Sequence, residues 1–227
     1  MTNTTRLRTA ADEQISAPRG SLSRGRLELT RGAARLTVRS AEIPDLFRAR
    51  FDRLAPSVSV DGGAVTVRYP RFSPRSWLRL WAHHGGQVTL NDDVTWEIRI
   101  RRGVAHLDAD LRDLKVESVD VSQGASRVDV RLPRPSGVVP VRVGGGASHV
   151  RIRRPAGTPV RLRIGRGVAD LTFDEQELGA VGGRLRLESP QAGSAGDRYD
   201  IEVSGGAAHL QVTTEPSSRQ GTGGETR

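Results

Sequence analysis

Hydrophobic and polar residues alternate along most of this chain. Residues 127–132, RVDVRL, and residues 160–164, VRLRI, are clear examples. A β-strand places successive side chains on opposite faces, so alternation of this kind predicts strands with one buried face and one exposed face.

The alternating segments belong to a repeated unit, apolar-x-apolar-x-x-Gly followed by small residues and a second alternating run. The copies run from Leu27 to Gly32, Ile98 to Gly103, Val119 to Gly124, Val141 to Gly146, Leu162 to Gly167 and Ile201 to Gly206. The marker glycines from 103 to 167 are spaced by 21 or 22 residues, and Gly206 follows 39 residues after Gly167. That longer gap predicts one degenerate copy, with Leu185 and Leu187 in its strand.

A period of this length with two short strands per unit is typical of stacked β coils. We therefore predict an all-β fold, a β-solenoid-like stack of two-strand units with a period of about 21 residues. We expect each marker glycine to supply a positive φ or a β-bulge where the chain turns a corner.

Three segments between residues 41 and 86 need separate interpretation. Residues 41–55 fit either a helix or a strand, and Pro44 favours the strand. Val58, Val60, Val65 and Val67 predict a hairpin around Asp61-Gly62-Gly63. Residues 68–86 interrupt the repeats and are interpreted as an inserted loop, a short helix or a cap on one end of the stack.

The polar ends of the chain lack periodicity. We predict a disordered arm over residues 1–20, one β domain over residues 21–214 and a disordered tail over residues 215–227. The N-terminus has no apolar run and no window is apolar enough for a transmembrane helix, so we expect a cytoplasmic protein.

Composition narrows the chemistry further. The absence of cysteine excludes disulfides, thiolate metal sites and cysteine nucleophiles. Gly165-x-Gly167 is followed by a strand rather than a helix, which argues against a dinucleotide site. No sequence typical of a serine hydrolase, a nucleotide-binding loop or a zinc peptidase is present. We expect a protein that is not an enzyme and that needs no cofactor.

The repeats in residues 124–174 and the segment DRYDIEVSGGAAHLQV resemble the bacterial toastrack domains, which are also named "putative adhesin" domains. These are related to the C-terminal domain of LiaF-type cell-envelope stress proteins, and the resemblance covers roughly residues 25–213. It implies a right-handed β-solenoid-like domain that binds or senses rather than catalyses. The function it implies is an interaction or scaffold module, with a link to envelope stress sensing.

Arginine dominates the charge of residues 127–166, which hold ten arginines and a single acid, Asp129. Because stacked strands lie about 4.8 Å apart, outward arginines are expected to form a ladder. The residues predicted to form it are Arg131, Arg142, Arg151, Arg153, Arg161 and Arg163. The ladder is interpreted either as a solvated face, paired with acids of neighbouring coils such as Asp110 and Asp174, or as a site for polyanions or anionic membranes.

Three histidines, His106, His149 and His209, share the position three residues after a marker glycine. Arg127 and Asp170 occupy this position in other copies, which indicates an exposed polar position rather than a catalytic or metal site. His83-His84 lacks a third ligand at fixed spacing, so we expect no bound metal.

Partner contacts are expected from the inserted segment as well. Trp77 and Trp81 are four residues apart and are candidates for contact with a protein partner. An anionic polymer, a membrane surface and a second copy of the chain are the alternatives.

Overall fold

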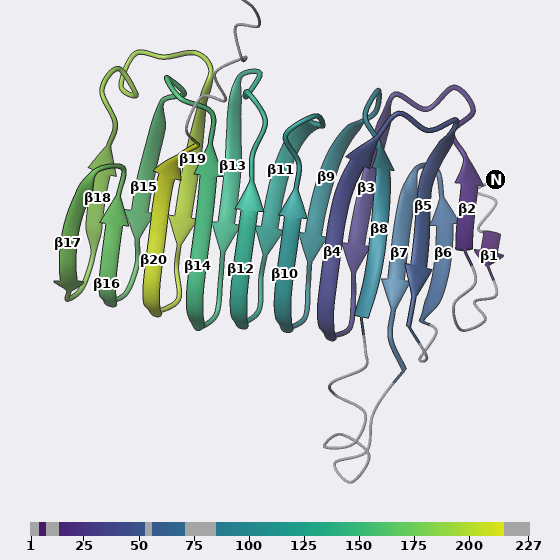
Figure 1. Ribbon diagram of the computed structural model, residues 1–227, viewed down its shortest axis with the longest axis horizontal. Coiled ribbons are helices and arrows are strands. Elements are labelled where there is room, and N and C mark those ends of the chain that lie inside the picture. The colour runs from purple at the N-terminus through teal and green to yellow at the C-terminus, as the bar shows by residue number, and fades with distance from the viewer. Residues whose placement is uncertain (1–4, 8–13, 53–55, 71–84, 216–227) are drawn as a thin grey trace, which may run out of the picture.

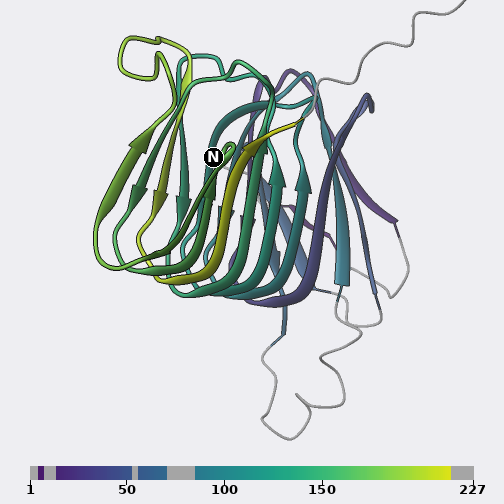
Figure 2. The same ribbon diagram turned by 60° about the vertical axis from the view of Figure 1, so that its left-hand side comes forward.

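The computed structural model describes residues 5–7, 14–52, 56–70 and 85–215, which form two ten-stranded β-sheets that face each other (Figures 1 and 2). The strands are β1 (Thr5–Leu7), β2 (Gln14–Pro18), β3 (Arg24–Leu29), β4 (Ala33–Ala41), β5 (Asp45–Phe51), β6 (Ser57–Asp61), β7 (Ala64–Arg68), β8 (Gly85–Asn91), β9 (Thr95–Ile100), β10 (Val104–Asp110), β11 (Lys115–Val121), β12 (Ala125–Arg131), β13 (Val138–Val143), β14 (Ala147–Arg154), β15 (Val160–Ile164), β16 (Val168–Phe173), β17 (Gln176–Val181), β18 (Leu185–Glu188), β19 (Arg198–Val203) and β20 (Ala207–Thr214). None of the described residues lies in a helix.

The strand order shows how the repeats are arranged. Sheet A has the order β1-β6-β7-β3-β9-β11-β13-β19-β15-β18, and sheet B has the order β17-β16-β20-β14-β12-β10-β4-β8-β5-β2. Each repeat contributes its first strand to sheet A and its second strand to sheet B, joined by the narrow turns at the lower edge of Figure 1. Neighbouring coils pair in parallel, with Leu107, Val128 and Val150 in one register. The predicted stack of two-strand units is therefore confirmed.

The core lies between the sheets and is built from the inward half of each alternating strand. Val128 and Val130 of β12 are each 1% exposed, and Leu162 of β15 is fully buried. Trp96 fills the space above Gly25, which lies opposite it on β3, and its indole Nε1 donates a hydrogen bond to the Asn91 carbonyl at 2.8 Å. Burial of these apolar faces is the main source of stability in such a stack.

Three marker glycines, Gly32, Gly103 and Gly124, are required for close approach rather than for an unusual backbone conformation. A Cβ atom at Gly103 would lie 2.9 Å from the Gly124 carbonyl oxygen, and one at Gly124 would lie 2.8 Å from the Gly146 oxygen. None of these glycines has a positive φ, so our expectation on that point was wrong. At these corners the successive coils stack too tightly to leave room for a side chain, whereas a Cβ atom at Gly146 would have no atom within 4 Å.

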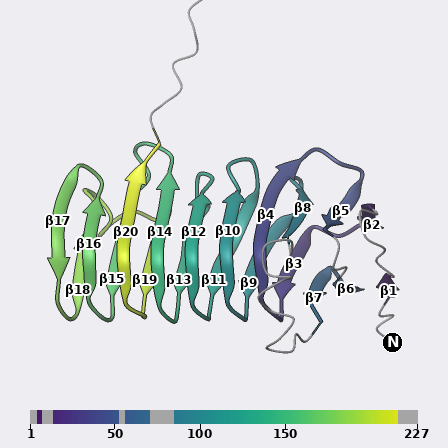
Figure 3. The ribbon, with the colours of Figure 1, turned by 60° about the horizontal axis from the view of Figure 1, so that its bottom comes forward.

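The order of the coils in space differs from their order in the chain. The last coil, β19–β20, lies between β13–β14 and β15–β16, with Ile201 opposite both Val141 and Leu162 (Figures 1 and 3). The strand predicted at Leu185 and Leu187 exists as β18, but it pairs antiparallel with β15 at the end of sheet A. The 39-residue gap therefore allows the chain to extend to the end of the stack and return.

Antiparallel strands terminate the stack at both ends. Strands β17 and β18 do so at one end, and β1, β2, β5 and β6 do so at the other. Strand β5 shows that Asp45–Phe51, within the ambiguous segment 41–55, form a strand, and the β6–β7 hairpin is confirmed. The predicted disordered arm is wrong for Gln14–Pro18 and Thr5–Leu7, since these residues pair as edge strands.

Two predicted features fall on residues outside the described ranges. Residues 71–84 contain Trp77, Trp81 and His83-His84, and residues 216–227 make up nearly all of the predicted tail. The structure therefore does not test these predictions.

Insertion of the last coil gives a direct test of the packing. A Cβ atom at Gly205 would overlap the Gly145 carbonyl group of the neighbouring coil. We expect Gly205→Ala to lower the free energy of unfolding by more than about 2 kcal/mol, measured by urea denaturation. Gly193→Ala is the control, because no atom lies within 4 Å of a Cβ atom placed there. Equal stability of the two variants would contradict the tight docking of this coil.

Candidate functional site

The six arginines predicted to form one ladder lie on two different faces. Arg131, Arg151 and Arg153 belong to strands β12 and β14 of sheet B. Arg142, Arg161 and Arg163 belong to strands β13 and β15 of sheet A. The single ladder was wrong because consecutive strands of the chain enter opposite sheets, whereas the spacing of about 4.8 Å applies only within one sheet.

From β3 to β15, one row on the outer face of sheet A alternates in charge from strand to strand, and Arg163 at its end lies opposite Arg186 of β18. In register order its residues are Glu28, Arg99, Asp120, Arg142, Glu202 and Arg163. Arg142 lies 3.9 Å from Glu202, and Arg161 lies 3.4 Å from Glu188. Arg142, Arg161 and Arg163 also line one depression of about 200 Å³ together with the acids Asp200 and Glu202. This face largely neutralises its own charge.

The three arginines of sheet B are also paired with acids. Arg153 donates two hydrogen bonds to Asp129, at 2.8 and 2.9 Å, and Arg151 lies 3.7 Å from the same carboxylate. Arg131 lies 3.3 Å from Asp110 and 3.5 Å from Glu215. Pairing with acids of neighbouring coils, which we expected for a solvated face, is thus present on both sheets.

Asp110 shows how strongly these pairs influence a carboxylate. Arg112 donates hydrogen bonds to both oxygens of Asp110, at 2.8 and 2.7 Å. These bonds are the main reason that the pKa of Asp110 is lowered to about 2, and partial burial opposes the change.

Another row of side chains on sheet B differs from these paired arginines, because it contains three histidines. We call it the histidine row, and in register order it consists of Arg35, His106, Arg127, His149, His209 and Asp170. His106 is half-buried and the other five residues are exposed, which agrees with the exposed polar position predicted for this part of the repeat. Insertion of the last coil places His209 between His149 and Asp170, an adjacency that chain order does not suggest.

The histidines of this row contact each other directly. The rings of His149 and His209 stack with their centroids 4.7 Å apart and their planes 18° apart. His209 Nδ1 lies 3.1 Å from Asp170 Oδ2. Among the described residues, Arg35, His106 and Arg127 have no side-chain hydrogen bond or ion pair.

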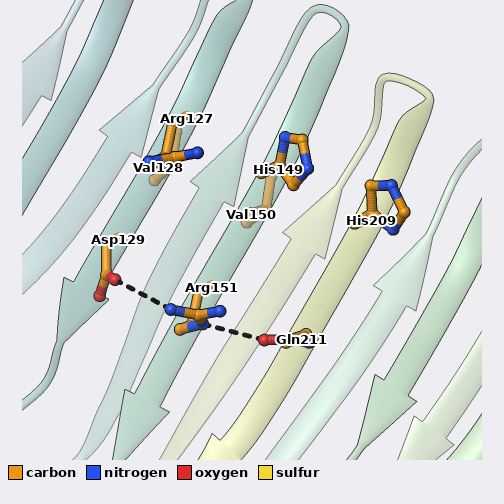
Figure 4. A pocket seen from close by; sticks show the side chains of 8 residues that line it. All are labelled: Arg127, Val128, Asp129, His149, Val150, Arg151, His209 and Gln211. Atoms are coloured by element: carbon orange, nitrogen blue, oxygen red, sulfur yellow. Dashed lines mark hydrogen bonds and ion pairs between the residues drawn. The ribbon is translucent and has the colours of Figure 1, made fainter.

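A shallow depression of about 340 Å³ opens beside this row (Figure 4). Arg127, His149 and His209 form one wall, and Asp129, Arg151 and Gln211 form the other. Arg151 Nε donates a hydrogen bond to Gln211 Oε1 at 2.9 Å, so the second wall is held by contacts within the protein. The first wall leaves its polar nitrogen atoms largely available to a ligand.

Arg154 is a buried cation that we did not select from the sequence. Its side chain is 2% exposed, it donates to both Asp174 oxygens at 2.7 and 2.8 Å, and its Nε donates to the Thr158 carbonyl at 2.9 Å. The alternation of the sequence indicates that Arg154 faces inward, because Val150, Ile152 and Arg154 occupy the same inward set. This buried ion pair is structural.

Two further properties concern only the described part of the chain. Its residues contain no group of three or more His, Asp or Glu side chains arranged to hold a metal ion. It also contains no helix with the length and apolar character needed to cross a membrane.

Comparison with known proteins identifies related folds. A family model described as the N-terminal domain of toast_rack, DUF2154, matches residues 6–153, more than half of the chain. The curated proteins contain no match.

Among solved structures, the fold is similar to that of a "putative cell adhesion protein" from Clostridium sporogenes ATCC 15579. The TM-score is 0.66 and the sequence identity 14%, over 94% of this chain and 100% of that chain. At this identity the likeness concerns the fold alone.

The Asp110 pair predicts a specific dependence of stability on pH. Because the pKa of Asp110 is lowered from 3.8, its carboxylate stabilises the folded state above about pH 4, and this contribution is lost as pH falls toward about 2. We expect Asp110→Asn to be less stable than wild type at neutral pH and to lose stability less steeply below about pH 4, measured by denaturant unfolding. The control is Glu175→Gln, which removes one negative charge from an exposed side chain and should behave like wild type. Parallel curves for Asp110→Asn and wild type would refute the assignment.

Proposed function

Because this chain belongs to the family of toast_rack N-terminal domains, we propose that it is a non-enzymatic interaction module that binds its partner through the outer face of a sheet. The observation that carries this proposal is the regular presentation of polar side chains, in register, across neighbouring parallel strands of one sheet face. Such faces suit extended partners, whereas small substrates are usually bound in concave pockets. Family membership also suggests a role without catalysis.

Adhesion is the finer form of this proposal. The solved structure with a similar fold is named for cell adhesion, which supports a surface-binding role here without identifying a ligand. The resemblance to LiaF-type domains adds the hypothesis that the partner belongs to the cell envelope. A protein that contacts Trp77 and Trp81 is one form of such a partner.

A polyanion is the second candidate partner, and the distribution of charge favours it. The chain carries a formal net charge of +9, and a basic surface attracts nucleic acids, anionic polymers and anionic membranes. On sheet A the arginines alternate with acids, whereas the histidine row of sheet B contains one acid among six residues. Sheet B is therefore the face that we expect to bind a polyanion.

Binding to single-stranded DNA and to anionic vesicles over a range of salt concentrations tests the polyanion hypothesis. We expect affinity to fall steeply as salt rises, because bound counterions are released from the polyanion. Arg131→Ala/Arg151→Ala/Arg153→Ala on sheet B should weaken binding more than Arg142→Ala/Arg161→Ala/Arg163→Ala on sheet A, although each variant removes three charges.

Two outcomes would contradict this expectation. Equal loss in both variants would show that net charge matters and that the face does not. No binding by wild type at low salt would exclude the polyanion. The test would then move to protein partners, using Trp77→Ala/Trp81→Ala, and to self-association measured by sedimentation.

A further inference from the structure

We propose that the histidine row of sheet B is a binding site for a linear chain of phosphate groups, and that it holds this chain more tightly when its imidazoles are protonated. The proposal rests on the function proposed above and names the site, the ligand chemistry and the condition that regulates binding.

The first argument is the lack of internal partners for the row. Arg35, His106, Arg127 and His149 form no side-chain hydrogen bond or ion pair within the described residues, and His149 stacks on the ring of His209. The acid of the row, Asp170, lies at its end and is already engaged by His209 at 3.1 Å. The nitrogen atoms of the row therefore face solvent with few competing carboxylates.

The second argument concerns the acids that lie nearest to the row. Two residues further along the strands, Asp108 and Asp129 project from the same face. Asp108 receives two hydrogen bonds from Arg39, both at 3.0 Å, and this pairing lowers the pKa of Asp108. Asp129 is occupied by Arg153 and Arg151. Because the adjacent acids are already paired with arginines outside the row, the row remains available to an external anion.

Spacing and donor geometry favour phosphate over carboxylate. Successive side chains of the row are separated by one strand, as shown by the 4.7 Å between the His149 and His209 rings. A single arginine fork satisfies both oxygens of a carboxylate. A phosphate group in a polymer has oxygens directed to both sides and can accept hydrogen bonds from two neighbouring members of the row. The depression of about 340 Å³ beside Arg127, His149 and His209 provides room for such groups (Figure 4).

The stacked imidazoles explain why binding should depend on pH. Imidazole gains its proton in the range near neutrality, and a protonated ring has two donors and a positive charge. The charged groups that face the histidines are Arg35 and Arg127 beside His106, Arg127 beside His149, and Asp170 beside His209. Asp108, Asp129 and Arg151 flank the row two residues along the strands.

Protonation of both stacked rings places like charges 4.7 Å apart, and a bound phosphate chain relieves that repulsion. Proton uptake and phosphate binding therefore favour each other.

The test uses the full chain and labelled inorganic polyphosphate, with binding measured by fluorescence anisotropy. We expect affinity to rise about tenfold as pH falls from about 8 to about 5.5. The triple variant His106→Gln/His149→Gln/His209→Gln should lose this rise, whereas His83→Gln/His84→Gln, which changes the two remaining histidines, should keep it. A triple variant that retains the pH response would overturn the proposal.

Matched charge variants locate the site independently of pH. Arg127→Gln and Arg163→Gln each remove one exposed arginine, from sheet B and sheet A respectively. Only Arg127→Gln should weaken binding and lower the slope of log affinity against log salt, by about one. Asp170→Asn removes the acid of the row and should tighten binding.

Separate outcomes test the proposed function and this inference. If wild type binds polyphosphate but Arg127→Gln and Arg163→Gln weaken it equally, the histidine row is not the site and the polyanion-binding function stands. If polyglutamate binds as tightly as polyphosphate, the preference for phosphate is wrong. If wild type binds neither polymer at any pH, both the polyanion-binding function and this inference are wrong.

Discussion

The burial of one apolar face of every strand between two sheets is the constraint on which the rest of this structure depends. Val128, Val150 and Leu210 lie side by side in sheet B, and Val119, Val141 and Ile201 do so in sheet A. Because side chains alternate with a period of two, fixing this inward set also fixes which residues face solvent. The outer faces are thus a consequence of core packing, and their chemistry varies without disturbing the core.

Charge on those faces is arranged differently on the two sides of the molecule. On sheet A, acids and arginines alternate across strands, and cross-strand pairs of opposite charge are stabilising. On sheet B, the row that contains Asp108 and Asp129 is neutralised by arginines further along the strands, and the histidine row beside it is not. One scaffold therefore presents a self-paired face and a face with available cations. This asymmetry is the reason to seek a ligand on sheet B.

The sequence predicted much of the fold because the signals are local. Alternation identified the strands of the repeats, the spacing of Gly103, Gly124 and Gly146 identified the coils, and Gly62-Gly63 identified the hairpin. The candidate site was predicted less well. Arg151 and Arg163 look equivalent in the sequence, yet they lie on opposite faces because they belong to different halves of their repeats. Arg154 belongs to the inward set, but its partner Asp174 lies in another coil and was not identifiable from the alternation.

The sequence by itself determined the inward and outward sets of each strand, since these depend on neighbouring residues in the chain. Only the tertiary structure decided the order of the coils. Insertion of β19–β20 between β13–β14 and β15–β16 places His209 against His149 and Asp170. All coils offer a similar apolar edge, so the local pattern does not specify which two will pair. The contact between the last coil and its neighbours resolves that choice, and with it the composition of the histidine row.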